Sequence, residues 1–282
     1  MNVLLLLAVI LGISGQDIAK KIYTEKTGEK GAYVASSFGT FFALLFFVVT
    51  SKNMTFETEF LPYSIAFGLS FSVTAFFGLL AVANGPLSLS SLIISYSLMI
   101  PTVYGLIFLK EDVSVCLIIG ILMVIISLFL INKKNDKCPI TPKWLIFIFI
   151  TFAGNGLCST FQKMQQVAFN GEYKNEFMIV ALAIVVVIFA VISLFTNKGK
   201  IKEYLYHARF TAPVSGLLCG LANMMVMVLS GRMPVSLMFP IVSAGGIVVT
   251  YLISKYLYKE NLSRMQFYGL IIGIASIVLL SI

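Results

Sequence analysis

Charged residues are scarce in this sequence. Asp, Glu, Lys and Arg together make up 11% of its 282 residues, whereas a soluble protein carries roughly 25%. Hydrophobic residues make up 59% of the chain, and the mean hydropathy is +0.98. So few charges cannot cover the surface of a soluble fold of this length. The composition therefore excludes a soluble globular protein and predicts an integral membrane protein whose surface mostly faces lipid.

Metal-binding and redox side chains are also scarce. The single histidine, His207, lies in a basic segment, and the four cysteines include no Cys-x-x-Cys pair. Metal sites need several imidazole, thiolate or carboxylate ligands close together, and a cysteine in an apolar run behaves as a small hydrophobe. We therefore expect no metal, no cofactor and no disulfide framework.

The net charge of +8 does not indicate nucleic acid. Binding to nucleic acid would need basic residues clustered on one face, and here they are scattered through short segments between apolar runs. Such segments set the orientation of membrane helices instead. We expect membrane lipid, and no nucleic acid, as a partner.

Long apolar runs make up most of the chain. A membrane-spanning helix needs about 20 mostly apolar residues, and the sequence divides into ten such runs, near residues 2–22, 33–51, 61–83, 86–109, 113–132, 143–168, 177–195, 210–230, 235–258 and 262–282. The first run also resembles a signal peptide, although no basic residue precedes it. We predict an all-α membrane protein with ten transmembrane helices, in which the polar linker 133–142 separates residues 1–132 from 143–282.

The two halves resemble each other in sequence. Moving residues 104–131 forward by 149 positions matches residue types that are uncommon in this chain: Lys110-Glu111 with Lys259-Glu260, Gly120 with Gly269, and Ser127 with Ser276. A weaker match, at a shift of 142 positions, places Gly12 on Gly154 and Lys21 on Lys163. With five helices per half, the second half enters the membrane from the opposite side. We therefore predict inverted repeats around a central cavity, a plan that gives alternating access.

Loop charges predict the orientation. Counted together with the adjoining ends of the runs, the loops after the odd-numbered runs carry 15 Lys and Arg residues, and those after the even-numbered runs carry 5. Basic segments stay in the cytoplasm, so both termini are expected outside it. We expect a multi-pass protein of a bacterial or archaeal inner membrane.

The two Lys-Glu junctions, each followed by a glycine in the next apolar run, resemble the repeat ends of the EamA-type drug/metabolite transporter superfamily. The resemblance spans the chain and implies ten helices in two repeats, with a proline in the fourth helix of each. Pro101 and Pro240 would be these prolines, although they stand 10 and 20 residues before their acidic residues. The family usually has Gly-Glu at the junction, and usually keeps both termini in the cytoplasm, against the charge count.

Polar side chains inside apolar runs are costly and are candidates for function. Asp17 and Lys21 are spaced to share one face of the first run. If Asp17 is functional, it is the candidate site for a coupling proton or cation, and the alternative is a structural ion pair with Lys21. In the sixth run, four polar residues form a stripe beside Lys163: Asn155, Ser159, Gln162 and Gln166. The stripe lines a cavity or bonds neighbouring helices.

Other candidates follow the same logic. Asn84, Tyr96 and Asn223 add polar side chains to the third, fourth and eighth runs. Pro101, Pro240, Gly245 and Gly246 weaken two helices locally and are candidates for gating.

These features favour a secondary active transporter of small metabolites, with amino acids or organic anions as substrates because of the lysines. The expected partners are a small-molecule substrate and a proton or cation as coupling ion, and the protein would be a monomer or homodimer. The alternatives are a drug exporter of the same fold for cationic compounds, and an intramembrane lipid-modifying enzyme. We do not expect an enzyme, because an enzyme needs a clustered acid, base or nucleophile set.

Overall fold

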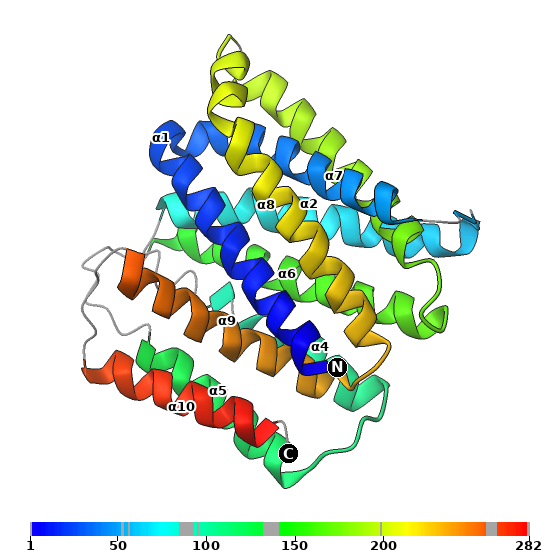
Figure 1. Ribbon diagram of the computed structural model, residues 1–282, viewed down its shortest axis with the longest axis vertical. Helices are drawn as coiled ribbons and strands as arrows, with labels where there is room; N and C mark the ends of the chain where they lie inside the picture. Colours follow the sequence, from blue (N-terminus) through cyan, green and yellow to red (C-terminus); the bar gives the residue numbers. More distant parts are fainter. Residues whose placement is uncertain are drawn as a thin grey trace.

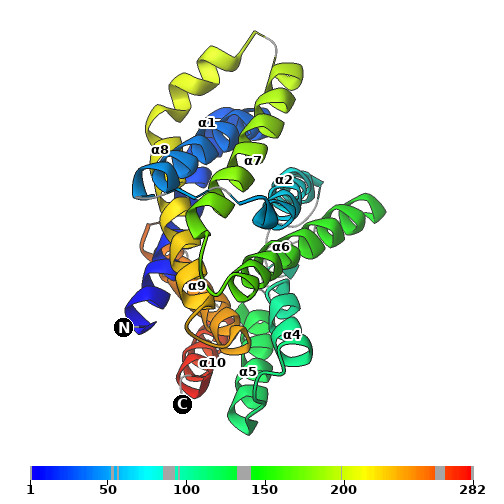
Figure 2. The ribbon, with the colours of Figure 1, turned by 90° about the vertical axis from the view of Figure 1, so that its right-hand side faces the viewer.

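Helices form almost all of the computed structural model (Figures 1 and 2). The structure describes residues 2–51, 54–55, 57–84, 93–94, 96–131, 141–197, 199–257 and 264–280. Its elements are α1 (Asn2–Thr50), the 3-10 turn η1 (Thr58–Phe60), α2 (Leu61–Asn84), α4 (Met99–Phe108), α5 (Val115–Ile131), α6 (Pro142–Ala168), α7 (Lys174–Thr196), α8 (Ile201–Ser230), α9 (Val235–Leu257) and α10 (Arg264–Leu280). No strand occurs in these ranges, so the prediction of an all-helical chain is confirmed for them.

Five of the described helical stretches are long and apolar enough to cross a membrane: Gly31–Thr50, Thr58–Gly78, Pro142–Ala168, Lys174–Thr196 and Ile201–Ser230. Shorter apolar helices are Asn2–Gln16, Met99–Phe108, Val115–Ser127, Val235–Gly246 and Phe267–Ser276. Large hydrophobic side chains stand exposed on most helices, for example Val49, Phe108 and Phe210 at 80%, 72% and 71% exposure. An apolar surface of this extent fits a lipid environment.

α1 corrects the prediction of a loop between the first two runs. It is helical through residues 23–32, and Figure 1 shows a first arm (Asn2–Gln16) leading away from the N-terminus and a second arm (Gly31–Thr50) returning. Tyr23 ties the bend, because its hydroxyl donates to the carbonyl of Gly31 at 2.9 Å. The same hydroxyl lies 3.4 Å from the carbonyl oxygen of Tyr204 in α8. A helical bend satisfies backbone hydrogen bonds that a loop would leave exposed.

Of the predicted run 86–109, the structure describes residues 93–94 and 96–109. Residues 97 and 98 form a turn, and α4 begins at Met99. Pro101 has no N–H to donate to the carbonyl of Ser97, four residues earlier, and that carbonyl accepts from Ile100 N at 3.0 Å instead. The proline therefore lies in the first turn of α4.

Sequence signals explain the start of α6. Thr141 accepts a hydrogen bond from the backbone N–H of Trp144 at 3.2 Å, and Pro142 occupies the first helical position. A threonine cap followed by proline is a common helix start. Most of the predicted linker 133–142, namely residues 133–140, lies outside the described residues.

The two ends of the bundle differ. Both termini lie at one end (Figure 1), together with the junctions 109–114, 169–173 and 231–234. We call this the terminal end. The opposite end, which we call the bend end, contains the α1 bend at residues 22–31, the end of α7 and the start of α8.

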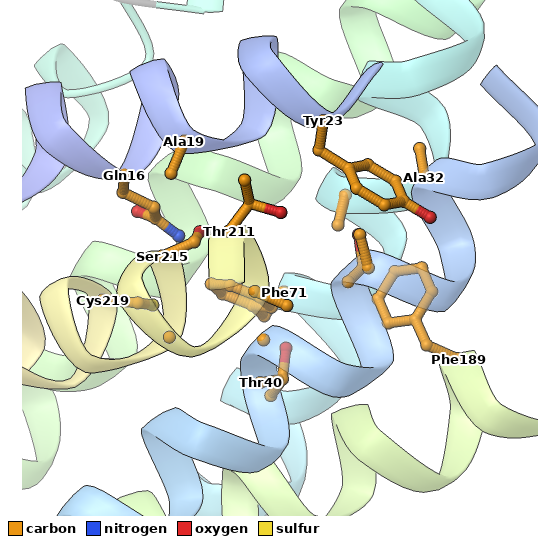
Figure 3. A pocket seen from close by; sticks show the side chains of 16 residues that line it. Gln16, Ala19, Tyr23, Ala32, Thr40, Phe71, Phe189, Thr211, Ser215 and Cys219 are labelled. Carbon is orange, nitrogen blue, oxygen red and sulfur yellow. The ribbon is translucent and has the colours of Figure 1, made fainter. Parts of the chain in front are cut away.

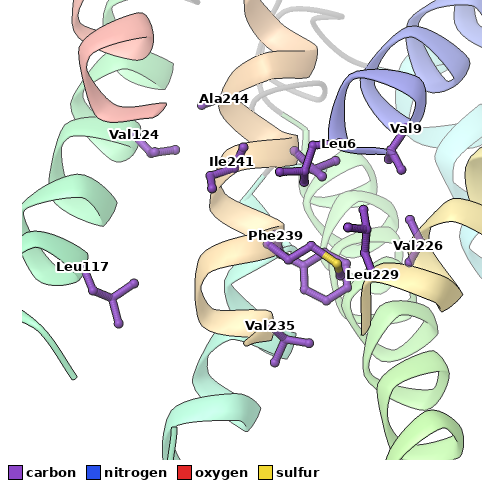
Figure 4. Close-up of a cluster of buried hydrophobic side chains, with 12 residues drawn as sticks. Leu6, Val9, Leu117, Val124, Val226, Leu229, Val235, Phe239, Ile241 and Ala244 are labelled. Atoms are coloured by element: carbon purple, nitrogen blue, oxygen red, sulfur yellow. The ribbon is translucent and has the colours of Figure 1, made fainter. Parts of the chain in front are cut away.

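The most extensive helix pairs join elements from before and after the linker: α1 with α8, α2 with α6, and α5 with α10. Two clusters of buried hydrophobic side chains contribute to the packing of α1 with α8 and of α2 with α6. One joins α9 to α1, α5 and α8, through side chains such as Phe239, Val9 and Leu117 (Figure 4). The other joins α7 to α1, α2, α6 and α8 around Phe177 and Phe67. In a third contact, Ser127 of α5 donates to the carbonyl of Gly269 in α10 at 2.7 Å.

Candidate functional site

A pocket of about 110 Å³ lies between the two arms of α1, α2, α7 and α8. Gln16, Thr211 and Ser215 face it with polar groups, and the rings of Tyr23 and Phe189 help to enclose it (Figure 3). Alanine and glycine occupy many of the remaining lining positions, and such small side chains leave the space open. Because Tyr23 and Ala32 flank the α1 bend, the pocket lies toward the bend end.

The pocket offers hydroxyl groups rather than charges among its described lining residues. Thr211 is the most informative, because its Oγ1 atom is buried and makes no hydrogen bond within the described part of the protein. A buried hydroxyl without a partner costs roughly 1–3 kcal/mol. A polar solute in the pocket would supply that partner.

A polar stripe on α8 continues from the pocket. Thr211, Ser215, Cys219 and Asn223 follow one another at intervals of four residues, so they share one helix face. The amide nitrogen Nδ2 of Asn223 donates to the Cys219 carbonyl at 2.9 Å and lies 3.4 Å from the Cys219 Sγ atom. The amide oxygen of Asn223 accepts from Gln162 Nε2 in α6 at 2.8 Å. The stripe therefore passes from α8 to α6.

The α6 side chains carry the polar contacts on to the terminal end. Lys163 follows Gln162 directly and is 7% exposed. Its Nζ atom donates to the carbonyl of Ser230, the last residue of α8, at 2.8 Å. Gln166, one turn further along α6, donates to Gln165, and its own Oε1 atom is buried without a partner in the described structure.

Glu111 completes the polar contacts at the terminal end. Its two carboxylate oxygens accept from the backbone N–H groups of Val235 and Ser236, each at 3.0 Å. These are the first residues of α9, whose N-terminal N–H groups have no partners within the helix and favour a negative charge. Lys163 Nζ lies 3.9 Å from Glu111 Oε1. We call Glu111, Lys163, Ser230, Val235 and Ser236 the terminal latch.

Close backbone contact shapes the latch. A Cβ atom on Gly105 would lie 2.6 Å from Glu111 Oε2, so the carboxylate rests against bare backbone. Lys110, which precedes Glu111, has a φ of 52°. This left-handed conformation turns the chain and directs the carboxylate toward α9, and it is one that residues other than glycine rarely adopt.

The structure places the other predicted site residues outside the pocket. Asn155 donates from Nδ2 to the Ser97 hydroxyl at 2.6 Å, at the turn before α4. Ser159 is half-buried in α6. Asn84 is exposed and bonds to Leu80 of its own helix, and the hydroxyl of Tyr96 donates to the Ile125 carbonyl of α5 at 3.2 Å. The bonds of Asn155 and Gln162 are those expected for interhelical packing, and a pathway role for these residues stays a prediction.

Asp17 and Lys21 belong to α1 by their backbone, directly after and five residues after the pocket residue Gln16, but their side chains lie outside the described residues. The four gating candidates are placed by the structure. Pro101 and Pro240 are buried, and Gly245 packs against Ile10 of the first α1 arm so closely that a Cβ atom would overlap it. A Cβ atom on Gly246 would meet nothing within 4 Å.

Sequence reasoning missed the pocket and the role of Glu111. The intervals of four from Thr211 to Asn223 could have indicated the polar face of α8. The recurrence of Lys-Glu in both halves marked Glu111 as unusual, but its partner lies 124 residues away in the sequence. Contacts at that separation leave no local signal.

No protein-family model and no curated protein matches this sequence. A crystal structure whose description states no function superposes on 98% of this chain and on 98% of its own length, with a TM-score of 0.75 and 12% sequence identity. At that identity the similarity concerns the fold alone. The complete arrangement of helices therefore has a counterpart among experimentally determined structures.

Proposed function

We propose that this chain is a secondary active transporter that moves small polar solutes across a membrane. The observation that carries the proposal is the continuous run of polar side chains from the pocket, through Asn223 and Gln162, to Lys163 at the terminal end. Buried polar groups inside an apolar bundle are costly, and in membrane proteins they mark substrate and ion pathways.

We further propose ten membrane-spanning helices in two inverted repeats, because equivalent glycines make equivalent contacts. A Cβ atom on Gly12 would lie 3.3 Å from the Leu218 carbonyl oxygen and 3.1 Å from Ala222 of α8. On Gly154, it would lie 3.3 Å from the Ser70 carbonyl oxygen and would overlap Thr74 of α2. Each glycine therefore faces a backbone carbonyl of the neighbouring helix and the side chain four residues after that carbonyl.

Helix packing supports the same repeats. The first α1 arm contacts α9 through Ile10 and Gly245, and α6 contacts the chain before and in α4 through Gly156, Ser97 and Ile100. If the halves are equivalent, the first α1 arm corresponds to α6, and α4 corresponds to α9. The contact between the first arm and α9 is then the repeat equivalent of the contact between α6 and α4. The five long and five shorter apolar helices supply the ten spans.

We also propose membership of the drug/metabolite transporter superfamily, EamA type. Its usual Gly-Glu junction corresponds to Lys110-Glu111, where the chain has the left-handed backbone that glycine favours. The acidic residue in this junction caps a helix of the other half. The left-handed backbone explains why glycine would be favoured at position 110, and the capping of α9 explains why an acidic residue would be favoured at position 111.

The pocket suits a small solute. Its volume is below the roughly 300–1,000 Å³ of typical ligand sites, so in this conformation it accepts molecules with few heavy atoms. Hydroxyl and amide groups would bind their polar ends, and Lys163 lies farther along the same path. Amino acids and small organic anions remain the favoured substrates.

Purified protein in liposomes tests this proposal. We expect saturable uptake of amino acids or organic anions that is accelerated by unlabelled substrate on the opposite side, as only a carrier allows. Thr211→Val removes the unpartnered hydroxyl and should raise KM several-fold while stability is kept, because no protein hydrogen bond is lost. Thr160→Val is the matched control, since its hydroxyl already bonds within α6 at 2.8 Å. Absence of exchange across a broad metabolite panel would refute the transporter proposal.

A further inference from the structure

The terminal latch joins three parts of the chain that a carrier would have to move apart. Glu111 comes from the α4–α5 junction, Lys163 from α6, and the remaining groups from the turn that joins α8 to α9. The α8 C-terminus carries partial negative charge and faces the Lys163 ammonium, while the α9 N-terminus carries partial positive charge and faces Glu111. Each end of the α8–α9 turn is therefore held by a side chain of opposite charge.

The latch lies beyond the pocket, on the path to the terminal end. The pocket includes Cys219 on α8, and Asn223 and Gln162 connect that position to Lys163. A solute leaving the pocket in this direction would have to pass the contact between Glu111, Lys163 and the α8–α9 turn. At the bend end, the described contacts beside the pocket include the Tyr23 hydroxyl, which donates to the Gly31 carbonyl at 2.9 Å.

The latch is only partly saturated with hydrogen bonds. Lys163 Nζ has three protons, and among the described residues it makes one hydrogen bond, to the Ser230 carbonyl. Its 3.9 Å separation from Glu111 exceeds hydrogen-bond length. The buried Ser236 hydroxyl of the latch has no partner within the described structure, and neither has the buried Oε1 atom of Gln166, which lies outside the latch one turn along α6 from Lys163. Incomplete pairing lowers the cost of separation, as a reversible contact requires.

Pro240 provides a place for α9 to bend. Its ring occupies the position of an N–H that would otherwise bond to the Ser236 carbonyl, so the first turn of α9 lacks one internal hydrogen bond. The capping by Glu111 therefore stabilises the part of α9 that is held least by its own backbone.

We propose that Glu111 and Lys163 form the gate that closes the transport path at the terminal end, and that this gate opens when Glu111 leaves the N-terminus of α9. The proposal rests on the proposed transporter function. It assigns to Glu111 a role in the conformational cycle, and it predicts that the pocket is reached from the bend end while the latch is closed.

Accessibility of the pocket tests the gate without a known substrate. In a background in which Cys116, Cys138 and Cys158 are replaced by alanine, Cys219 is the remaining thiol. A membrane-impermeant maleimide is applied to one face of sealed, oriented vesicles at a time. With Glu111 and Lys163 unchanged in this three-alanine background, we expect Cys219 to react mainly when the maleimide is applied at the bend end. Glu111→Gln, and Glu111→Gln with Lys163→Met, should raise its rate from the terminal end by about tenfold or more, because charge-assisted hydrogen bonds are lost.

Glu172→Gln is the matched control, since Glu172 is an exposed acidic residue at the same end, and it should leave the rates unchanged. Equal labelling from both ends in the wild-type background overturns the gate, and this result does not depend on any variant folding. Unchanged labelling in folded Glu111 variants overturns it as well. Labelling that shifts as expected, in protein that exchanges no solute in liposomes, keeps the gate and removes the transport proposal.

Discussion

At the scale of single residues, the turn at Lys110 determines where the Glu111 carboxylate lies. Lys110 is exposed and has a φ of 52°, so its side chain contributes little packing while its backbone is strained. For a residue with a Cβ atom the left-handed conformation costs roughly 1–2 kcal/mol. The strained backbone of Lys110 thus positions the Glu111 carboxylate at the N-terminus of α9.

Lys110→Gly should therefore raise the free energy of unfolding by about 1 kcal/mol, because glycine adopts this backbone without strain. Denaturation of the purified protein in detergent measures the change. Asp112→Gly is the control, since Asp112 is also exposed but is not among the residues with positive φ, and it should give no gain. A loss of stability in Lys110→Gly would show that the lysine side chain contributes more than its backbone costs.

At the scale of helices, α1 and α8 pack through glycine. A Cβ atom on Gly216 would overlap the Gly39 carbonyl oxygen and lie 2.8 Å from the Phe42 Cβ atom. The two backbones therefore touch, which small residues permit in membrane helices. Gly246 of α9 differs, because no atom would meet a Cβ atom there.

These two glycines should respond to alanine in opposite directions. Gly216→Ala should reduce the free energy of unfolding by about 1–3 kcal/mol through overpacking, and Gly246→Ala should increase it by up to about 1 kcal/mol through helix propensity. Thermal denaturation in detergent compares them. If α9 must bend near Gly246, the more stable Gly246→Ala protein will also transport more slowly, and an unchanged rate would remove Gly246 from the gating candidates.

Much of the helical arrangement could be predicted from sequence, and the reasons are local. The bounds of α2, α6 and α9 lie within a residue or two of the predicted runs 61–83, 143–168 and 235–258, since apolar length and caps are properties of consecutive residues. The helical bend of α1 could not be predicted, because its polar composition resembles a loop. α8 begins at Ile201, whereas the predicted run begins at 210. The prediction placed the start too late because the first turns of α8 expose polar side chains and bury only Tyr204 and Ala208.

The candidate site was less predictable. Gln162, Lys163 and Asn223 stood out because amide and charged groups are rare in apolar runs. In the structure Gln162 bonds to Asn223, and Lys163, the next residue in α6, bonds to the end of α8. Thr211 and Ser215 did not stand out, because small hydroxyl residues also serve ordinary helix packing. What distinguishes them is the space beside them, which depends on how α1 and α8 pack.

At the scale of the whole molecule, orientation follows from which end carries the basic segments. Of the two ends, the bend end has the larger share of Lys and Arg, so we expect it in the cytoplasm and the termini outside. In a cysteine-free background, Glu172→Cys should react with an impermeant maleimide on intact cells and Lys202→Cys should not. Both residues are exposed, one at each end. The reverse result would favour the cytoplasmic termini that the superfamily usually has.

The pairing of α1 with α8, α2 with α6 and α5 with α10 has a consequence for biosynthesis. The main partner of each of these early helices lies in the second half of the chain. In the proposed membrane arrangement, the nascent first half therefore enters the bilayer with Gln16 and Thr40 not yet covered by α7 and α8. Until α8 is synthesised, these two polar side chains lack the neighbours that enclose them in the folded protein. Packing of α1, α2 and α5 against their main partners therefore has to wait for the second half of the chain.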